Sequence, residues 1–142
     1  MKRKLCILFA CVSCLLLPIF KIHFIGSYPF SGLNVDAVEQ VTIVYSKSEY
    51  SLTAEECVEL VELLHPIKIY QKKNYSEYIG LNPYNFFRMK YRDGKIIEFS
   101  ANNPLFIIDM IGYRTDTRAC GAVDDFYFSC VKRRRSLWPF FC

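Results

Sequence analysis

The sequence predicts an α+β fold: an antiparallel sheet of about five strands with two helices packed on one face, preceded by one N-terminal transmembrane helix. Three observations predict it. They are an uncharged stretch after a basic start, several short segments with alternating apolar residues, and two segments with apolar residues at helical spacing. At 142 residues, with 52% apolar and 16% aromatic residues, the chain is long enough for one packed domain.

The N-terminal stretch has a basic start at residues 2–4 and carries no charge over residues 5–20. At roughly 1.5 Å per residue, a helix over that stretch is shorter than a hydrocarbon core of roughly 30 Å. Extension to residue 25 closes the gap when the polar side chains near its end reach the headgroups. We therefore expect residues 1–25 to be an uncleaved signal anchor, and the positive-inside rule places the rest of the chain outside the cytoplasm.

A lipoprotein anchored at Cys14 is the alternative. Val12 and Ser13 resemble the residues that precede a lipidated cysteine. Cys11 departs from that pattern, and the apolar run continues after Cys14 where a polar tether is expected. An anchor and a lipoprotein would both keep the domain at the membrane surface.

The rest of the chain divides into a linker at residues 26–36, a domain over residues 37–133 and a basic, aromatic tail over residues 134–142. The net charge is +4, but the excess lies in the basic runs at the two ends, between which Asp and Glu outnumber Lys and Arg. A nucleic-acid binder is expected to carry a basic surface on the folded body. The charge pattern favours a membrane partner, and we expect no nucleic-acid partner.

The domain starts with a predicted strand at residues 38–47 and a short return strand near residues 50–52. Thr53 and Glu56 then form a capping box, which predicts the start of a helix that ends before Pro66. The apolar face of that helix holds Cys57, Leu60, Val61 and Leu64. Its outward face holds Glu55, Glu59 and Glu62, which we expect to be solvated rather than metal-binding.

Further strands are expected at residues 67–71, in a hairpin within residues 86–100, and at residues 105–113. A three-residue loop ending at a left-handed Gly94 gives the hairpin a register in which apolar residues face one another. The cross-strand pairs in that register are Met89 with Ile97, Phe87 with Phe99 and Arg88 with Glu98. Residues 105–113 are apolar on both faces, which predicts one covered inner strand.

The segment at residues 118–135 alternates like a strand at Phe126, Phe128 and Cys130, but a helix there makes the longer apolar stripe. Asp116 or Thr117 would cap that helix, and the basic run at its end suits the helix dipole. The stripe consists of Ala119, Ala122, Val123, Phe126, Tyr127 and Cys130. We expect a helix.

This order of elements over residues 38–133 resembles the β-α-β4-α half of the TATA-binding-protein-like fold. The layout of a membrane leader followed by one small domain also resembles that of membrane-tethered extracytoplasmic domains of Gram-positive bacteria. The first resemblance implies an antiparallel sheet with helices on one face, and the second implies a location outside the cytoplasm.

Few side chains are placed for catalysis. His23 lies at the membrane edge, and His65 ends a helix, where a capping role is expected. Asp109, inside an apolar strand, is the best candidate for a functional carboxylate of an extracytoplasmic hydrolase, but an ion pair with Arg88 or Arg114 is the simpler expectation. No phosphate-binding glycine loop and no zinc spacing occur, so we expect neither a cofactor nor a metal.

Binding features are more prominent. Tyr75, Tyr78 and Tyr84 are candidates for an aromatic patch that contacts a protein or peptide partner. Near the C-terminal end of the sequence, a second membrane contact is expected from Arg133, Arg134, Arg135, Trp138, Phe140 and Phe141, or the aromatic residues fold back on the domain. One disulfide is plausible outside the cytoplasm among Cys57, Cys120, Cys130 and Cys142. The sequence therefore predicts a noncatalytic, membrane-anchored domain that binds or senses a partner at the cell surface.

Overall fold

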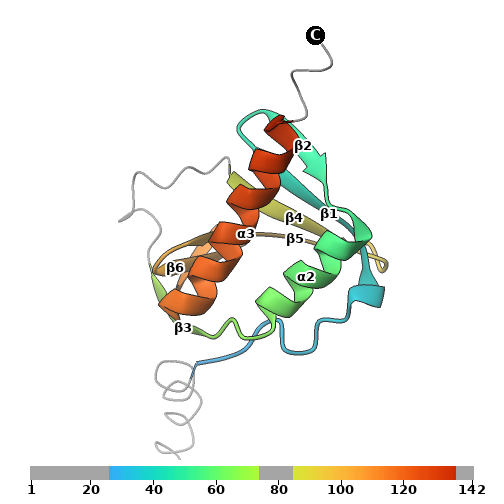
Figure 1. Ribbon diagram of the computed structural model, residues 1–142. Coiled ribbons are helices and arrows are strands. Elements are labelled where there is room, and N and C mark those ends of the chain that lie inside the picture. Colours follow the sequence, from blue (N-terminus) through green and yellow to red (C-terminus); the bar gives the residue numbers. More distant parts are fainter. Residues whose placement is uncertain (1–25, 74–84, 137–142) are drawn as a thin grey trace, which may run out of the picture.

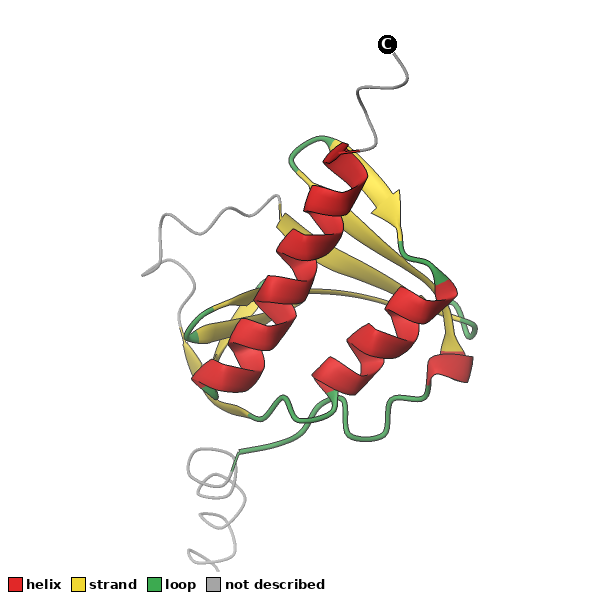
Figure 2. Ribbon diagram, viewed as in Figure 1, coloured by secondary structure: helices red, strands yellow, loops and turns green. Residues whose placement is uncertain are grey.

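The structure is a computed structural model that describes residues 26–73 and 85–136. Two helices cover one face of an antiparallel sheet, which confirms the α+β prediction (Figure 1, Figure 2). The sheet has seven strands, whereas the sequence predicted about five. Among the described residues no helix is long and apolar enough to cross a membrane, and residues 1–25 lie outside them.

The strands are joined in the order β2-β1-β4-β5-β6-β7-β3, and every neighbouring pair is antiparallel. The strands are β1 (Val38–Tyr45), β2 (Ser48–Ser51), β3 (Ile69–Lys73), β4 (Asn85–Tyr91), β5 (Ile96–Asn102), β6 (Leu105–Ile108) and β7 (Ile111–Thr115). The helices are the short 3-10 helix η2 (Val35–Ala37), α2 (Ala54–Leu64) and α3 (Thr117–Ser136).

The β4–β5 hairpin has the predicted register. Phe87 faces Phe99, Arg88 faces Glu98 and Met89 faces Ile97. Gly94 has a φ of 87°, as a three-residue loop with a left-handed last residue requires. The outer pair is an ion pair, with Arg88 Nε 2.9 Å from Glu98 Oε1.

The prediction of one strand over residues 105–113 is wrong. The chain reverses at Asp109 and Met110, both with positive φ (47° and 66°), and forms the β6–β7 hairpin. Aspartate tolerates this conformation better than most residues. The Asp109 Oδ1 atom also accepts the backbone N–H of Glu98 at 2.9 Å. Apolar residues surround the turn and no glycine or proline lies at it, so the sequence pattern did not indicate a turn there. One strand was therefore expected where the structure has β6 and β7.

Residues 26–36, expected to be a linker, pack against the domain. Ser27 exchanges two backbone hydrogen bonds with Ile69, each 2.8 Å long. Phe30 is buried against the rings of Phe99 and Phe106. Gly26 has a φ of 74°, and a Cβ there would lie 2.8 Å from the carbonyl oxygen of Ile69. The folded domain therefore begins about ten residues earlier than its composition suggested.

Both helices pack through the faces that their sequences predicted, with a small shift in α3. In α2 the capping box of Thr53 and Glu56 is present, and Leu60, Val61 and Leu64 are buried. Asp116 caps α3 by accepting the N–H groups of two residues in the first turn. The buried side chains of α3 are Cys120, Val123, Phe126, Tyr127, Cys130 and Val131, whereas Ala119 and Ala122 are half-buried.

We predict that Gly94→Ala lowers the free energy of unfolding by about 1 kcal/mol, because a φ of 87° disfavours any residue with a Cβ. An added Cβ would meet no atom within 4 Å, so the cost lies in the backbone alone. Gly121→Ala, in the interior of α3 with equally open surroundings, is the matched control and should stabilise the protein by about 0.5–1 kcal/mol. Chemical denaturation measures both, and an equal effect of the two substitutions would contradict the left-handed turn.

Candidate functional site

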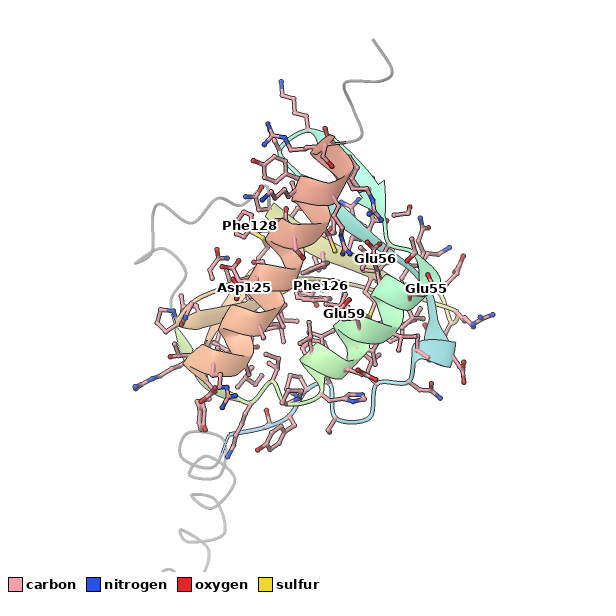
Figure 3. All side chains as sticks on the ribbon, viewed as in Figure 1. Glu55, Glu56, Glu59, Asp125, Phe126 and Phe128 are labelled. Atoms are coloured by element: carbon pink, nitrogen blue, oxygen red, sulfur yellow. The ribbon has the colours of Figure 1, made fainter. Side chains whose placement is uncertain are left out.

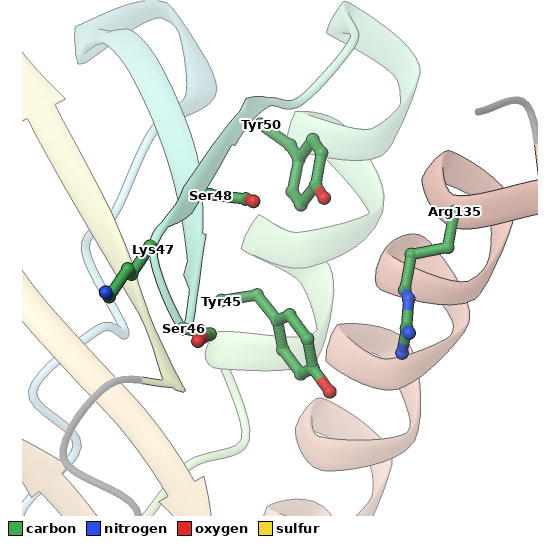
Figure 4. A pocket seen from close by; sticks show the side chains of 6 residues that line it. All are labelled: Tyr45, Ser46, Lys47, Ser48, Tyr50 and Arg135. Carbon is green, nitrogen blue, oxygen red and sulfur yellow. The ribbon is translucent and has the colours of Figure 1, made fainter. Parts of the chain in front are cut away.

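A groove lies between the β1–β2 turn and the last turns of α3. Its first part is a hollow of about 460 Å³ lined by Tyr45, Ser46, Lys47, Ser48, Tyr50 and Arg135 (Figure 4). Its second part is a hollow of about 600 Å³ lined by Tyr45, Phe128, Val131, Lys132, Arg135 and Ser136. Because Tyr45 and Arg135 line both hollows, we treat them as one site and call it the α3 groove.

The β1–β2 turn forms one wall of the groove. Tyr45 pairs with Ser48, so only Ser46 and Lys47 connect the strands. Ser46 has a φ of 56°, an unfavourable value for a residue other than glycine. Side chains of alternate residues share a face of the sheet, so Tyr45, Ser48 and Tyr50 all lie on the side of the helices. Figure 4 shows the two tyrosine rings on one side and Arg135 on the other.

The end of α3 forms the other wall. Phe128, Val131, Lys132 and Arg135 lie at helical spacing, so they follow one another along a single face of α3. Phe128 is 50% exposed although it is a large apolar side chain. The guanidinium of Arg135 lies 5.7 Å from the centre of the Tyr45 ring, a cation–π contact that joins the two walls.

Glu56 holds the end of α3 in place. Its Oε2 and Oε1 atoms accept hydrogen bonds from Arg134 at 2.6 and 3.0 Å, and Arg133 lies 3.2 Å from Oε1. Arg134 also donates to the carbonyl of Ser51 at 3.1 Å. Figure 3 shows Glu56 between α2 and α3. Burial by itself raises the pKa of Glu56, but the hydrogen bonds from Arg134 and from the N–H of Thr53 outweigh it, and the pKa lies below its usual value.

The groove carries positive charge without a carboxylate to balance it. Arg133 and Arg134 share the charge of Glu56, but in the part of the chain that the structure describes no ion pair involves Lys47, Lys132 or Arg135. The lining residues include no Asp or Glu. An anionic group in the groove would therefore meet Arg135, Lys132 and the serine hydroxyls, whereas the ammonium of Lys47 points away from Arg135 (Figure 4).

Among the residues that line the groove, no histidine, cysteine or carboxylate lies beside the serine hydroxyls. Within residues 26–73 and 85–136, no cluster of His, Cys, Asp or Glu is suited to hold a metal ion.

The residues expected to bind are divided between described and undescribed parts of the chain. Arg135 lines the groove, and Arg133 and Arg134 are bound to Glu56. The remaining candidates, Tyr75, Tyr78, Tyr84, Trp138, Phe140 and Phe141, lie outside the described residues.

Asp109 does not occupy the buried position that an apolar strand predicted. It is exposed in the β6–β7 turn. The expected ion pair of Asp109 is also absent among the described residues, since Arg88 binds Glu98 and Glu49 and Arg114 makes no ion pair. His65 ends α2, but its Nε2 atom lies 2.8 Å from the carbonyl oxygen of Leu33, which is not in its own helix.

The described cysteines, Cys57, Cys120 and Cys130, are free thiols, so no disulfide joins any two of them. Cys142 lies outside the described residues. Burial raises the pKa of the Cys120 thiol to about 12 and also raises the pKa values of Cys57 and Cys130. These thiols are therefore protonated at neutral pH, which disfavours nucleophilic chemistry.

The sequence analysis missed the groove because it placed Ser46 and Lys47 inside a strand. A polar Ser-Lys-Ser run between two tyrosines was the available signal for a turn. Nothing local indicated that Glu56 would meet Arg134, because these residues are 78 positions apart.

The comparisons with known proteins are negative: no family model, no curated protein and no solved structure matches the chain.

We predict that Glu56→Gln lowers the free energy of unfolding at pH 7 by about 2 kcal/mol, because it leaves Arg134 without its charged partner. Glu59→Gln, on the exposed side of the same helix, is the matched control and should cost less than about 0.5 kcal/mol. Chemical denaturation of the two variants beside the native protein gives the comparison.

The same interaction predicts a dependence on pH. The folded-state pKa of Glu56 is lowered, so its stabilisation is complete above the unfolded value of about 4.5 and is lost as pH falls through the folded value. Denaturation at pH 7 and in steps below about 4.5 should show the native protein converging on Glu56→Gln. A constant difference between the two down to pH 2 would be inconsistent with this ion pair.

Proposed function

We propose that this protein is a noncatalytic binding domain, held at the membrane by residues 1–25, that engages a protein or peptide partner outside the cytoplasm through the α3 groove. The observation that carries the proposal is the position of the groove, which lies at the end of the domain opposite to the point where the chain leaves toward residues 1–25 (Figure 1).

The hydrogen bonds fix the place where the described chain begins. Ser27 is bonded to Ile69 of β3. Ile69 is paired with Thr115 at the end of β7, and α3 starts two residues later. The described chain therefore begins beside the first turn of α3.

The groove lies at the other end of the same helix. With 20 residues and a rise of roughly 1.5 Å per residue, α3 is about 30 Å long. The first described residues and the groove are thus separated by nearly the length of the domain. If residues 1–25 lie in a bilayer and α3 points away from it, the groove faces the aqueous phase.

This geometry favours a partner in solution over a second contact with the anchoring membrane. A tail contact through Arg133, Arg134 and Arg135 would need the domain to lie with α3 along the bilayer. Two of those arginines are also bound to Glu56, so only part of the basic run is available to headgroups.

We predict that the full chain fractionates with membranes and retains its N-terminus, and that alkaline phosphatase fused after Cys142 is active because it folds outside the cytoplasm. Cell fractionation, intact-mass measurement and the phosphatase assay give the three results. A green fluorescent protein fusion at the same position is the control, and it should stay dark.

A mass that matches a chain beginning at a diacylated Cys14 would replace the anchor by a lipoprotein. An inactive phosphatase fusion together with a fluorescent control would contradict the extracytoplasmic location.

A further inference from the structure

The α3 groove combines a cationic half and an apolar half, and this combination defines a class of ligand. We infer that the groove binds an extended segment of a partner protein in which acidic side chains flank an apolar or aromatic one. The inference rests on the proposed function and adds to it the chemistry of the partner.

The cationic half selects for carboxylates. Arg135 lies beside the first hollow and Lys132 beside the second, whereas the ammonium of Lys47 points away from Arg135 (Figure 4). A guanidinium offers paired donors that match the two oxygens of a carboxylate, and the hydroxyls of Ser46 and Ser48 add further donors. Since the lining residues include no acid, an acidic ligand displaces no internal ion pair.

The apolar half favours a ligand with an apolar or aromatic side chain, which can bury apolar surface there. Phe128 packs edge-on against Tyr127 with ring centres 5.3 Å apart, yet half of Phe128 stays exposed. Val131 lies next to it but is only 4% exposed, so Phe128 supplies the exposed apolar surface. Exposed aromatic residues next to arginine are typical of the anchor points of protein interfaces.

The length of the groove suits a short extended segment. From Phe128 to Ser136 the helix rises about 12 Å, a distance that about four extended residues span. β2 is an edge strand of the sheet and lies beside the groove. The carbonyl of its Ser51 already accepts a hydrogen bond from Arg134. In an antiparallel strand the outward backbone groups alternate, so those of Glu49 also face the open edge, where a peptide strand can pair.

The location separates this ligand from an anionic lipid surface, which shares the same charge. A headgroup layer beside the first described residues would have to reach the opposite end of the domain, whereas a soluble partner reaches it directly. The segment of a partner protein is therefore the occupant that we infer.

The test uses the full chain, isotope-labelled, in nanodiscs of neutral phosphatidylcholine, and follows the amide resonances of Ser46, Lys47 and Arg135 by NMR. The probes are three blocked peptides: Gly-Glu-Phe-Glu-Gly, its charge-reversed form Gly-Lys-Phe-Lys-Gly, and Gly-Glu-Ala-Glu-Gly. The first peptide should shift these resonances at the lowest concentration, and its binding should weaken as salt is added.

Two variants locate the contacts. Arg135→Gln and Phe128→Ala should each weaken binding of the first peptide by about fivefold or more. Arg118→Gln removes an exposed cation from the other end of α3 and should leave binding within about twofold. Thermal unfolding of each variant shows whether the fold is retained. If Arg118→Gln weakens binding as much as Arg135→Gln, the loss of affinity reflects the lower net charge of the protein, and the α3 groove is not the binding site.

The remaining outcomes separate the two proposals. If the acidic and the charge-reversed peptide bind at the groove equally well, the groove does not select acidic segments. The proposal that the protein is a binding domain would still hold. If no peptide binds but the groove resonances shift in nanodiscs that contain phosphatidylglycerol, the groove faces the membrane, which contradicts both proposals.

Discussion

The ion pair between Glu56 and Arg134 is the interaction on which the arrangement of this domain depends. One carboxylate accepts the N–H of Thr53 that starts α2 and two hydrogen bonds from the end of α3. The same arginine reaches the Ser51 carbonyl at the end of β2. Desolvation of the pair costs free energy, and these additional hydrogen bonds offset that cost. The result is a fixed distance between α3 and the β1–β2 hairpin, the two walls of the groove.

The elements that the sequence analysis predicted correctly are those with local causes. The capping box of Thr53 and Glu56, the Asp116 cap and the loop ending at Gly94 each depend on residues within a few positions of one another. The register of β4 and β5 follows from the alternation of their apolar residues. The reversal at Asp109 was missed because apolar residues flank this aspartate on both sides and no glycine or proline lies at the turn.

The candidate site was less predictable because tertiary contacts create it. Tyr45 belongs to a strand, Phe128 and Arg135 belong to a helix, and no spacing in the sequence relates them. Glu56 carried a recognisable local role as a cap, which concealed its second role as the partner of Arg134. Composition also misplaced the start of the domain, since Phe30 enters the core from a segment rich in Gly, Pro and Ser.

The most direct test of this account is hydrogen–deuterium exchange at the backbone amides of residues 131–136, compared between the native protein and Glu56→Gln. If Glu56 holds the end of α3, exchange there becomes faster in the variant, while residues 121–126 of the same helix stay protected. Unchanged exchange over residues 131–136 would show that the end of α3, and with it the groove, is held by other contacts.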